Sequence, residues 1–136
     1  MNRTVDFVKM YCNWVESCLL DDDKLEELAF FKLGLDLCVR QKELIAIKWE
    51  QVNFPYVENI KILKATFAGK CYPPREISLN TMEILNELST DREFIFTKDI
   101  SKMIDSIRES IGDNLFSGHM LRKFGATLIS FNFNEE

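Results

Sequence analysis

The chain has a single histidine, and its four cysteines show no CxxC spacing. Because protein zinc sites need clustered cysteine and histidine ligands, we expect reduced thiols, no metal and no cofactor. No apolar run approaches the roughly 18 residues that a membrane-spanning helix needs. The amino-terminal stretch MNRTVDFVKMY is interrupted by charges, unlike the apolar core of a secretory signal. These absences predict a cytoplasmic protein without a membrane partner.

An excess of basic residues is also missing. The chain holds 22 acidic and 17 lysine or arginine residues, which gives a formal net charge of −5. This balance argues against a strong, sequence-independent nucleic-acid binder, because lysine and arginine must neutralise phosphate in such proteins. The charge is uneven, however, since residues 61–75 contain four basic side chains and no acid. A local basic segment on an acidic protein is therefore compatible with the sequence.

The first half of the chain has the apolar spacing of helices. With 136 residues, 46% of them hydrophobic, it suffices for one domain with a single core. Apolar residues recur at helical spacing from Thr4, the expected N-cap, to about Leu20. The aspartates 21–23 suit the start of a second helix. This helix is expected to end near residue 37, and a third is expected over 41–48.

The second half changes character. Short segments rich in Val, Ile, Phe and Thr, separated by proline and glycine, predict a three-stranded antiparallel sheet over about 51–79. A helix capped by Asn80 should follow, and then EFIFT as a short buried strand or extended segment. An amphipathic helix that stops at Gly112 and a last helix from near Ser117 complete a mostly helical α+β domain.

Three segments in order carry motifs of a known kind. CVRQKELIAIKWEQV resembles a first arginine box, G-L-R-x-x-E-L-x-x-L-x-W. GKCYPPREISL resembles a hairpin, G-K-x-x-x-x-R-x-V-P-L, and SGHMLRKFGATLIS resembles a second box, S-x-H-x-L-R-H-x-F-A-T-x-L. Together they resemble the catalytic domain of tyrosine recombinases and phage integrases. Each motif is weakly specific alone, but three in order are a strong signal. The resemblance implies that residues 1–136 form one domain with that family's helical core and small three-stranded sheet.

The resemblance also implies roles for individual residues. In such an enzyme a tyrosine attacks a DNA phosphodiester, two arginines bind the phosphate, a lysine protonates the leaving oxygen and a histidine assists the nucleophile. Guanidinium groups suit a phosphate because they stay charged and donate bidentate hydrogen bonds. The implied catalytic set is Arg40, Lys70, His119 and Arg122, supported by Glu43, with Lys64, Arg75 and Lys123 as further DNA contacts.

Each of these residues also has an ordinary structural interpretation. A lone histidine is commonly a satisfied core residue, and Lys70 beside Gly69 suits a solvated turn. Arg40 can complement the carboxyl-terminal dipole of a preceding helix, and Glu43 can be a plain surface acid. Those interpretations remain open at the level of sequence.

The sequence departs from the family pattern where the nucleophile should be. No tyrosine follows Arg122, and Tyr11, Tyr56 and Tyr72 lie at positions that do not match the family's tyrosine. Cys38 stands at the glycine of the first box, and Lys123 at the second histidine of the last. The family's amino-terminal DNA-gripping domain has no counterpart either. The motifs therefore indicate the phosphate-binding groups without the attacking group.

The favoured hypothesis is an integrase-like DNA-binding protein without autonomous strand cleavage. It would act in phage or mobile-element DNA recombination or its regulation, in a bacterial or phage-infected cell. Two alternatives stay open: half of an active recombinase whose tyrosine comes from another chain, and an inactive remnant that acts through protein contacts. Phe131 and Phe133 alternate in the tail SFNFNEE, which suits self-association or a partner protein, or packing of the tail onto the domain itself.

Overall fold

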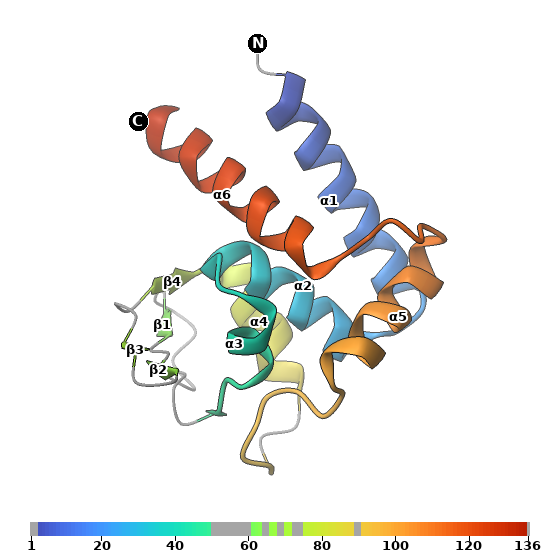
Figure 1. The fold of residues 1–136 in the computed structure, drawn as a ribbon, viewed down its shortest axis with the longest axis vertical. Helices are drawn as coiled ribbons and strands as arrows, with labels where there is room; N and C mark the ends of the chain where they lie inside the picture. The colour runs from blue at the N-terminus through green and yellow to red at the C-terminus, as the bar shows by residue number, and fades with distance from the viewer. Residues whose placement is uncertain are drawn as a thin grey trace.

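Helices dominate the described part of the chain. A computed structural model describes residues 3–49, 61–63, 66–67, 70–71, 75–88 and 91–135. The helices are α1 (Arg3–Asp21), α2 (Leu25–Leu37), α3 (Gln41–Ile45), α4 (Leu79–Glu87), α5 (Ile100–Ile111) and α6 (Gly118–Glu135). The strands are β1 (Lys61–Leu63), β2 (Thr66–Phe67), β3 (Lys70–Cys71) and β4 (Arg75–Ile77). The expectation of a mostly helical protein is confirmed (Figure 1).

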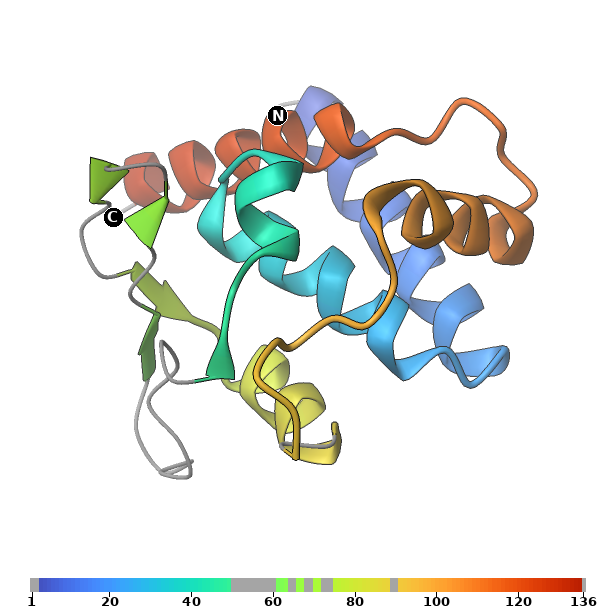
Figure 2. The same ribbon diagram turned by 60° about the horizontal axis from the view of Figure 1, so that its bottom comes forward.

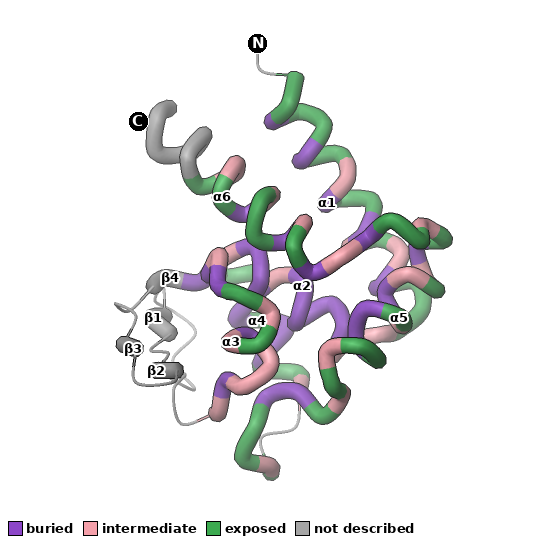
Figure 3. The backbone as a smooth tube through the Cα atoms, viewed as in Figure 1, coloured by how far each residue is buried: buried purple, intermediate pink, exposed green. Residues whose placement is uncertain are grey.

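Helix α2 forms the centre of the fold. It contacts every other helix and strand β4, and Figures 1 and 2 show it enclosed by them. Phe30 and Phe31 are fully buried, and buried residues occur all around the helix (Figure 3). A helix that is apolar on all sides belongs in the interior of a protein. The two ends of α2 therefore set the positions of the segments that leave it.

Helix α1 covers one side of this core. Its buried stripe consists of Val5, Val8, Cys12, Val15 and Leu19, at the helical spacing expected from the sequence. The helix begins at Arg3, so Thr4 lies inside it and the predicted N-cap is wrong.

The three aspartates end α1 instead of starting α2, which corrects the second predicted boundary. Asp21 is the last residue of α1, and Asp23 adopts a left-handed conformation with φ of 56°. Aspartate tolerates this conformation better than most residues, so it suits the turn. The N-cap of α2 is Lys24.

Helix α3 is shorter than the predicted span 41–48, because its last residues pair with another segment. Lys48 forms an isolated antiparallel bridge with Phe94. The Ile95 N–H donates to the Ile47 carbonyl at 3.1 Å, and the Trp49 N–H donates to the Glu93 carbonyl at 2.9 Å. Ile95 and Phe96 are buried but Glu93, Phe94 and Thr97 are exposed, so the prediction of a buried EFIFT segment is correct only for its two central apolar residues.

The described strands form two antiparallel pairs, β1 with β4 and β2 with β3. The first predicted strand, near residues 51–54, lies outside the described residues, so a three-stranded sheet stays a prediction. Helix α4 follows β4, and its N-cap is Ser78 instead of the expected Asn80. The Ser78 hydroxyl accepts a hydrogen bond from the Thr81 N–H at 3.2 Å, which places the cap two residues earlier.

The last two helices start and stop largely as expected. Asp99 caps α5, and Gly112 ends it with a φ of 68°. Helix α6 begins at Gly118 and continues to Glu135, so the backbone of the tail that carries Phe131 and Phe133 is helical. No proline or glycine follows Gly125 to stop the helix earlier.

Candidate functional site

The first arginine box lies in the sharp turn between α2 and α3. Cys38 ends α2 in a left-handed conformation with φ of 55°, a geometry that favours glycine. Val39 is buried, and Arg40 is the exposed N-cap of α3 in an extended conformation. The Glu43 carboxylate accepts the Arg40 backbone N–H at 3.4 Å. Glu43 thus supports the first turn of α3 and leaves the Arg40 guanidinium in solvent.

The second box forms the first turns of α6. His119, Arg122 and Lys123 are all exposed, so the alternative of a buried core histidine is wrong. The loop before this helix is held in place by the buried Phe116 ring and by Arg108, whose Nε donates to the Phe116 carbonyl at 2.7 Å. The basic residues therefore project from a helix whose start is anchored to α5.

A contact between a side chain and a glycine connects the two boxes. The Gln41 side chain lies against the Gly118 backbone, where an added Cβ would clash with its Oε1, Cδ and Cγ atoms. The start of α6 is therefore within reach of a side chain from the start of α3. Gly34 in α2 packs beneath Leu121, and a Cβ added there would lie 2.9 Å from the Leu121 Cδ1 atom. Figure 2 shows α3 beside the first turns of α6. Gln41 follows Arg40 directly, and Gly118 precedes His119.

The basic side chains of these boxes have no acidic partner within the described part of the chain. The ion pairs there involve neither Arg40, Arg122 nor Lys123, and His119 makes none either. Exposed guanidinium groups without a carboxylate partner can bind an external anion. Helix α6 also directs its amino-terminal dipole toward this region, which favours negative charge.

The hairpin residues are only partly placed. Lys70 begins β3 and Arg75 begins β4, while Lys64 lies outside the described residues. The root of the hairpin is fixed to the carboxyl-terminal part of α2, where Asp36 Oδ2 accepts from the Ser78 N–H at 3.0 Å and from the Thr81 hydroxyl at 2.7 Å. This places the end of β4 near the first box but leaves the position of the Lys70 ammonium unassigned.

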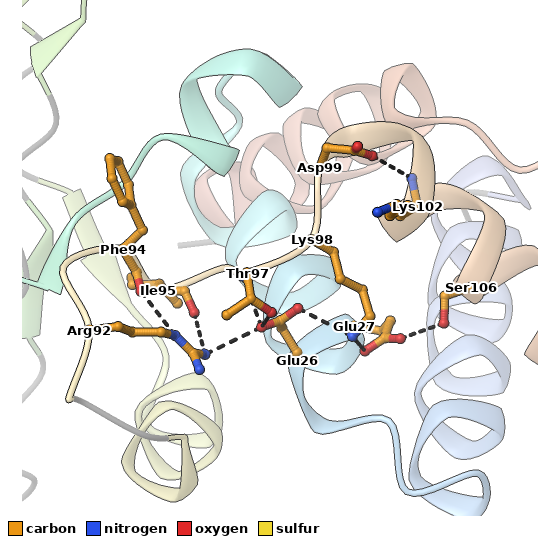
Figure 4. A network of polar contacts seen from close by, with 10 residues as sticks. All are labelled: Glu26, Glu27, Arg92, Phe94, Ile95, Thr97, Lys98, Asp99, Lys102 and Ser106. Carbon is orange, nitrogen blue, oxygen red and sulfur yellow. Dashed lines mark hydrogen bonds and ion pairs between the residues drawn. The ribbon is translucent and has the colours of Figure 1, made fainter.

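A polar network at the opposite end of α2 was missed by the sequence analysis (Figure 4). Glu26 Oε1 accepts from the Thr97 N–H at 3.0 Å and its hydroxyl at 2.8 Å, and Arg92 Nη2 lies 3.3 Å away. Lys98 Nζ lies 3.4 Å from Glu26 Oε2 and 3.6 Å from Glu27 Oε1. The only available signal was the acidic run DDDKLEEL, which looks like an ordinary helix start.

Glu27 is the most buried charged residue of this network, at 3% exposed. Its Oε2 accepts a short hydrogen bond from the Ser106 hydroxyl of α5. Lys24 completes the connection because its Nζ donates to the Ser106 carbonyl at 2.8 Å. The network therefore joins α2, the extended segment and α5, and its charges are satisfied internally.

Tyr11 is the one tyrosine whose side chain the structure describes. Its hydroxyl donates to Asp113 Oδ2 at 3.0 Å. Burial, the hydrogen bond and the negative charge of Asp113 together raise the pKa of Tyr11 well above its usual value of 10.0. A phenol that resists deprotonation and is held by a carboxylate is a poor nucleophile.

The remaining chemistry of the described residues is limited. No three of their His, Cys, Asp or Glu side chains are arranged to hold a metal ion. Cys12 is free and buried, and burial raises the pKa of its thiol to about 12. Over the same part of the chain, no helix is long and apolar enough to span a membrane.

Comparisons with known proteins leave the family of this chain open. No family model, no curated protein and no solved structure matches it. Only the residues and their geometry therefore bear on its function.

Proposed function

We propose that this protein binds the phosphate backbone of DNA through the two arginine boxes and does not cleave DNA by itself. The proposal places it in phage or mobile-element DNA recombination or in the regulation of that process, with a tyrosine-recombinase-like fold that includes the predicted three-stranded sheet. The observation that carries it is the contact of the Gln41 side chain with Gly118, which links the start of α3 to the start of α6. Arg40 and His119 each lie one residue from that contact.

The chemistry of the exposed groups supports a phosphate ligand. Arg40 and Arg122 offer planar sets of N–H donors that match two oxygens of a phosphate. Lys123 and the hairpin residues Lys70 and Arg75 would extend the basic surface along a duplex. The net charge of −5 argues for weak binding by one chain, on the order of the 10⁻⁴–10⁻⁶ M of non-specific contacts.

Fluorescence anisotropy with a labelled duplex at low salt tests this site. We expect Arg40→Ala and Arg122→Ala each to weaken binding by about 5–30-fold, since a charged hydrogen bond contributes roughly 1–2 kcal/mol. Each substitution should also reduce the salt dependence of binding by about one phosphate contact. Lys42→Ala is the matched control, because Lys42 is exposed in the short helix that Arg40 caps, two residues from Arg40.

Two results would contradict the proposal. If DNA binding is unchanged in both arginine variants, the arginine boxes are not the binding site. If Lys42→Ala weakens binding equally, the loss reflects only the change in net charge. In the first case the protein would act through protein contacts, as in the alternative of an inactive remnant.

Strand cleavage is tested separately with a suicide DNA substrate. We expect no covalent adduct, because no tyrosine follows Arg122 and Tyr11 is held by Asp113. An adduct that disappears on mutation of Tyr11, Tyr56 or Tyr72 would make this chain an enzyme. An adduct that forms only with a second, tyrosine-bearing chain would favour the divided-enzyme alternative.

A further inference from the structure

Helix α1 carries a second stripe on the side that solvent reaches. Its members follow one another at steps of four and three residues, the spacing at which helices pack in coiled coils. The stripe consists of Arg3, Phe7, Met10, Trp14, Ser17 and Asp21, all of them exposed. Phe7 is 57% exposed, Met10 72% and Trp14 43%. Large apolar residues grouped on one face in this way mark an interaction surface more often than isolated ones do.

The apolar part of this stripe is held in place from behind. The rings of Phe7 and Phe124 lie 6.4 Å apart, and those of Tyr11 and Trp14 lie 5.6 Å apart, both edge to face. Tyr11 is fixed in turn by its hydrogen bond to Asp113. A partner would therefore meet aromatic rings that are already ordered, which lowers the entropy cost of binding.

The stripe complements a second copy of itself when the two copies run in opposite directions. Read from its two ends, the stripe pairs Arg3 with Asp21, Phe7 with Ser17 and Met10 with Trp14. Two copies of α1 laid antiparallel would place each arginine of one copy near the aspartate of the other. Neither Arg3 nor Asp21 makes an ion pair within the described residues of its own chain.

We propose that this stripe is the interface of a homodimer in which two α1 helices pack antiparallel about a twofold axis. A twofold interface needs a surface that complements itself, and the stripe meets that condition in one orientation only. In a parallel arrangement the two arginines would meet at one end and the two aspartates at the other. The interface is separate from the arginine boxes and does not depend on the proposed DNA binding.

The dimensions of α1 predict a weak dimer. A helix of 19 residues is about 28 Å long, so one helix face covers less area than a standard interface. Met10 and Trp14 would form the dry centre, where aromatic residues and methionine are enriched in interfaces, and the charges would form the rim. We therefore expect a dimer that forms only at high chain concentration, since interfaces smaller than the standard size belong to weak, transient complexes.

Sedimentation equilibrium of the full chain without DNA, over about 5 µM to 1 mM, tests the interface. Met10→Lys should raise the dimer dissociation constant at least about thirtyfold, because each substitution occurs twice in a twofold dimer. Leu20→Lys is the matched control: Leu20 is 62% exposed on the same helix but lies off the stripe, so its dimer should persist. Circular dichroism would check that both variants stay folded.

Charge reversal tests the orientation. Arg3→Glu and Asp21→Lys should each weaken the dimer about threefold to tenfold, because each creates two like-charge contacts, and the double variant should restore it. A chain that stays monomeric at 1 mM overturns the proposal. So does a dimer that is insensitive to Met10→Lys, or one lost on deletion of residues 131–136, which would place the interface on α6. A double variant without recovery overturns the antiparallel arrangement.

Discussion

Charged residues have opposite environments at the two ends of α2. At the amino-terminal end, Glu26 and Glu27 are largely buried and surrounded by donors from the segment 92–98 and from α5. At the carboxyl-terminal end, Arg40 and its neighbours on α6 are exposed, and no acid within the described residues pairs with them. Charges that satisfy one another hold elements together. Charges of one sign gathered without partners do not stabilise the fold, which makes them candidates for binding.

Removal of Glu26 gives the largest expected effect and tests the first half of this comparison. Glu26→Ala should lower the free energy of unfolding by roughly 2–4 kcal/mol, because it leaves Arg92, Lys98 and Thr97 without their shared acceptor. Urea denaturation would measure it. Glu109→Ala, at an exposed position of α5, is the control and should change stability by less than about 0.5 kcal/mol. Equal losses of stability in both variants would show that the network stabilises the fold no more than an exposed glutamate does.

Acid should remove the stabilisation that the same network provides. Burial alone would raise the pKa of the Glu26 carboxyl, but hydrogen bonds from Thr97 and the charge of Lys98 outweigh it and lower the pKa below its usual 4.5. Because the folded pKa is below the unfolded one, the stabilisation is present above about pH 4.5 and is lost as pH falls through the folded value. Urea midpoints measured from pH 6 to pH 3 should therefore fall less in Glu26→Gln than in the original chain. Parallel curves would contradict this assignment.

A smaller effect is expected at the carboxyl-terminal end of α2, where Cys38 holds a left-handed conformation. Cys38→Gly should raise stability by about 0.5 kcal/mol, since relief of a strain of roughly 1–2 kcal/mol is partly offset by the extra freedom of glycine in the unfolded chain. The thiol also loses a weak hydrogen bond to the Leu35 carbonyl at 3.6 Å. Thermal unfolding would measure the shift.

Gly112 provides the reverse experiment in an equivalent position at the end of α5. Gly112→Ala should destabilise by about 1 kcal/mol, because φ is 68° there while nothing crowds the added methyl group. If Cys38→Gly destabilised as well, the thiol contacts would outweigh the backbone strain at the first box.

The smallest effect on stability should come from the arginines themselves. Arg40→Ala and Arg122→Ala should each change the free energy of unfolding by less than about 0.5 kcal/mol while they weaken DNA binding, since both side chains are exposed and without acidic partners in the described structure. The two measurements on one protein sample separate binding from folding. A loss of more than 1 kcal/mol would assign the arginines to the scaffold and weaken the contrast between the two ends of α2.

The sequence predicts those parts of the fold in which periodicity dominates. The stripe from Val5 to Leu19 and the stop at Gly112 follow from apolar spacing and from one residue with a special backbone conformation. Boundaries decided by tertiary contacts are not predictable in this way. Residues 47–49 leave the helical pattern because the segment 93–95, distant in sequence, pairs with them.

In the candidate site, too, the sequence predicts the residues that lie in a local motif but not the tertiary contacts between them. Motif order singles out Arg40, His119 and Arg122 as candidates, and all three side chains are exposed. The contact that brings their elements together depends on Gly118 and Gln41, which no local pattern distinguishes. The network around Glu26 and Glu27 was invisible for the same reason, since a buried acid on a helix looks like an exposed one until its partners are known.

Gly125 fixes how closely α6 approaches the end of α2. A Cβ at this position would lie 2.5 Å from the Leu35 carbonyl oxygen and 2.7 Å from Cys38 Sγ, so any larger residue must push the helix outward. The same helix carries Arg122, and the same turn carries Arg40. A residue without charge therefore limits how closely the helix with Arg122 approaches the turn with Arg40. A larger residue at Gly125 would therefore change the geometry of the proposed phosphate site without changing the charge of the protein.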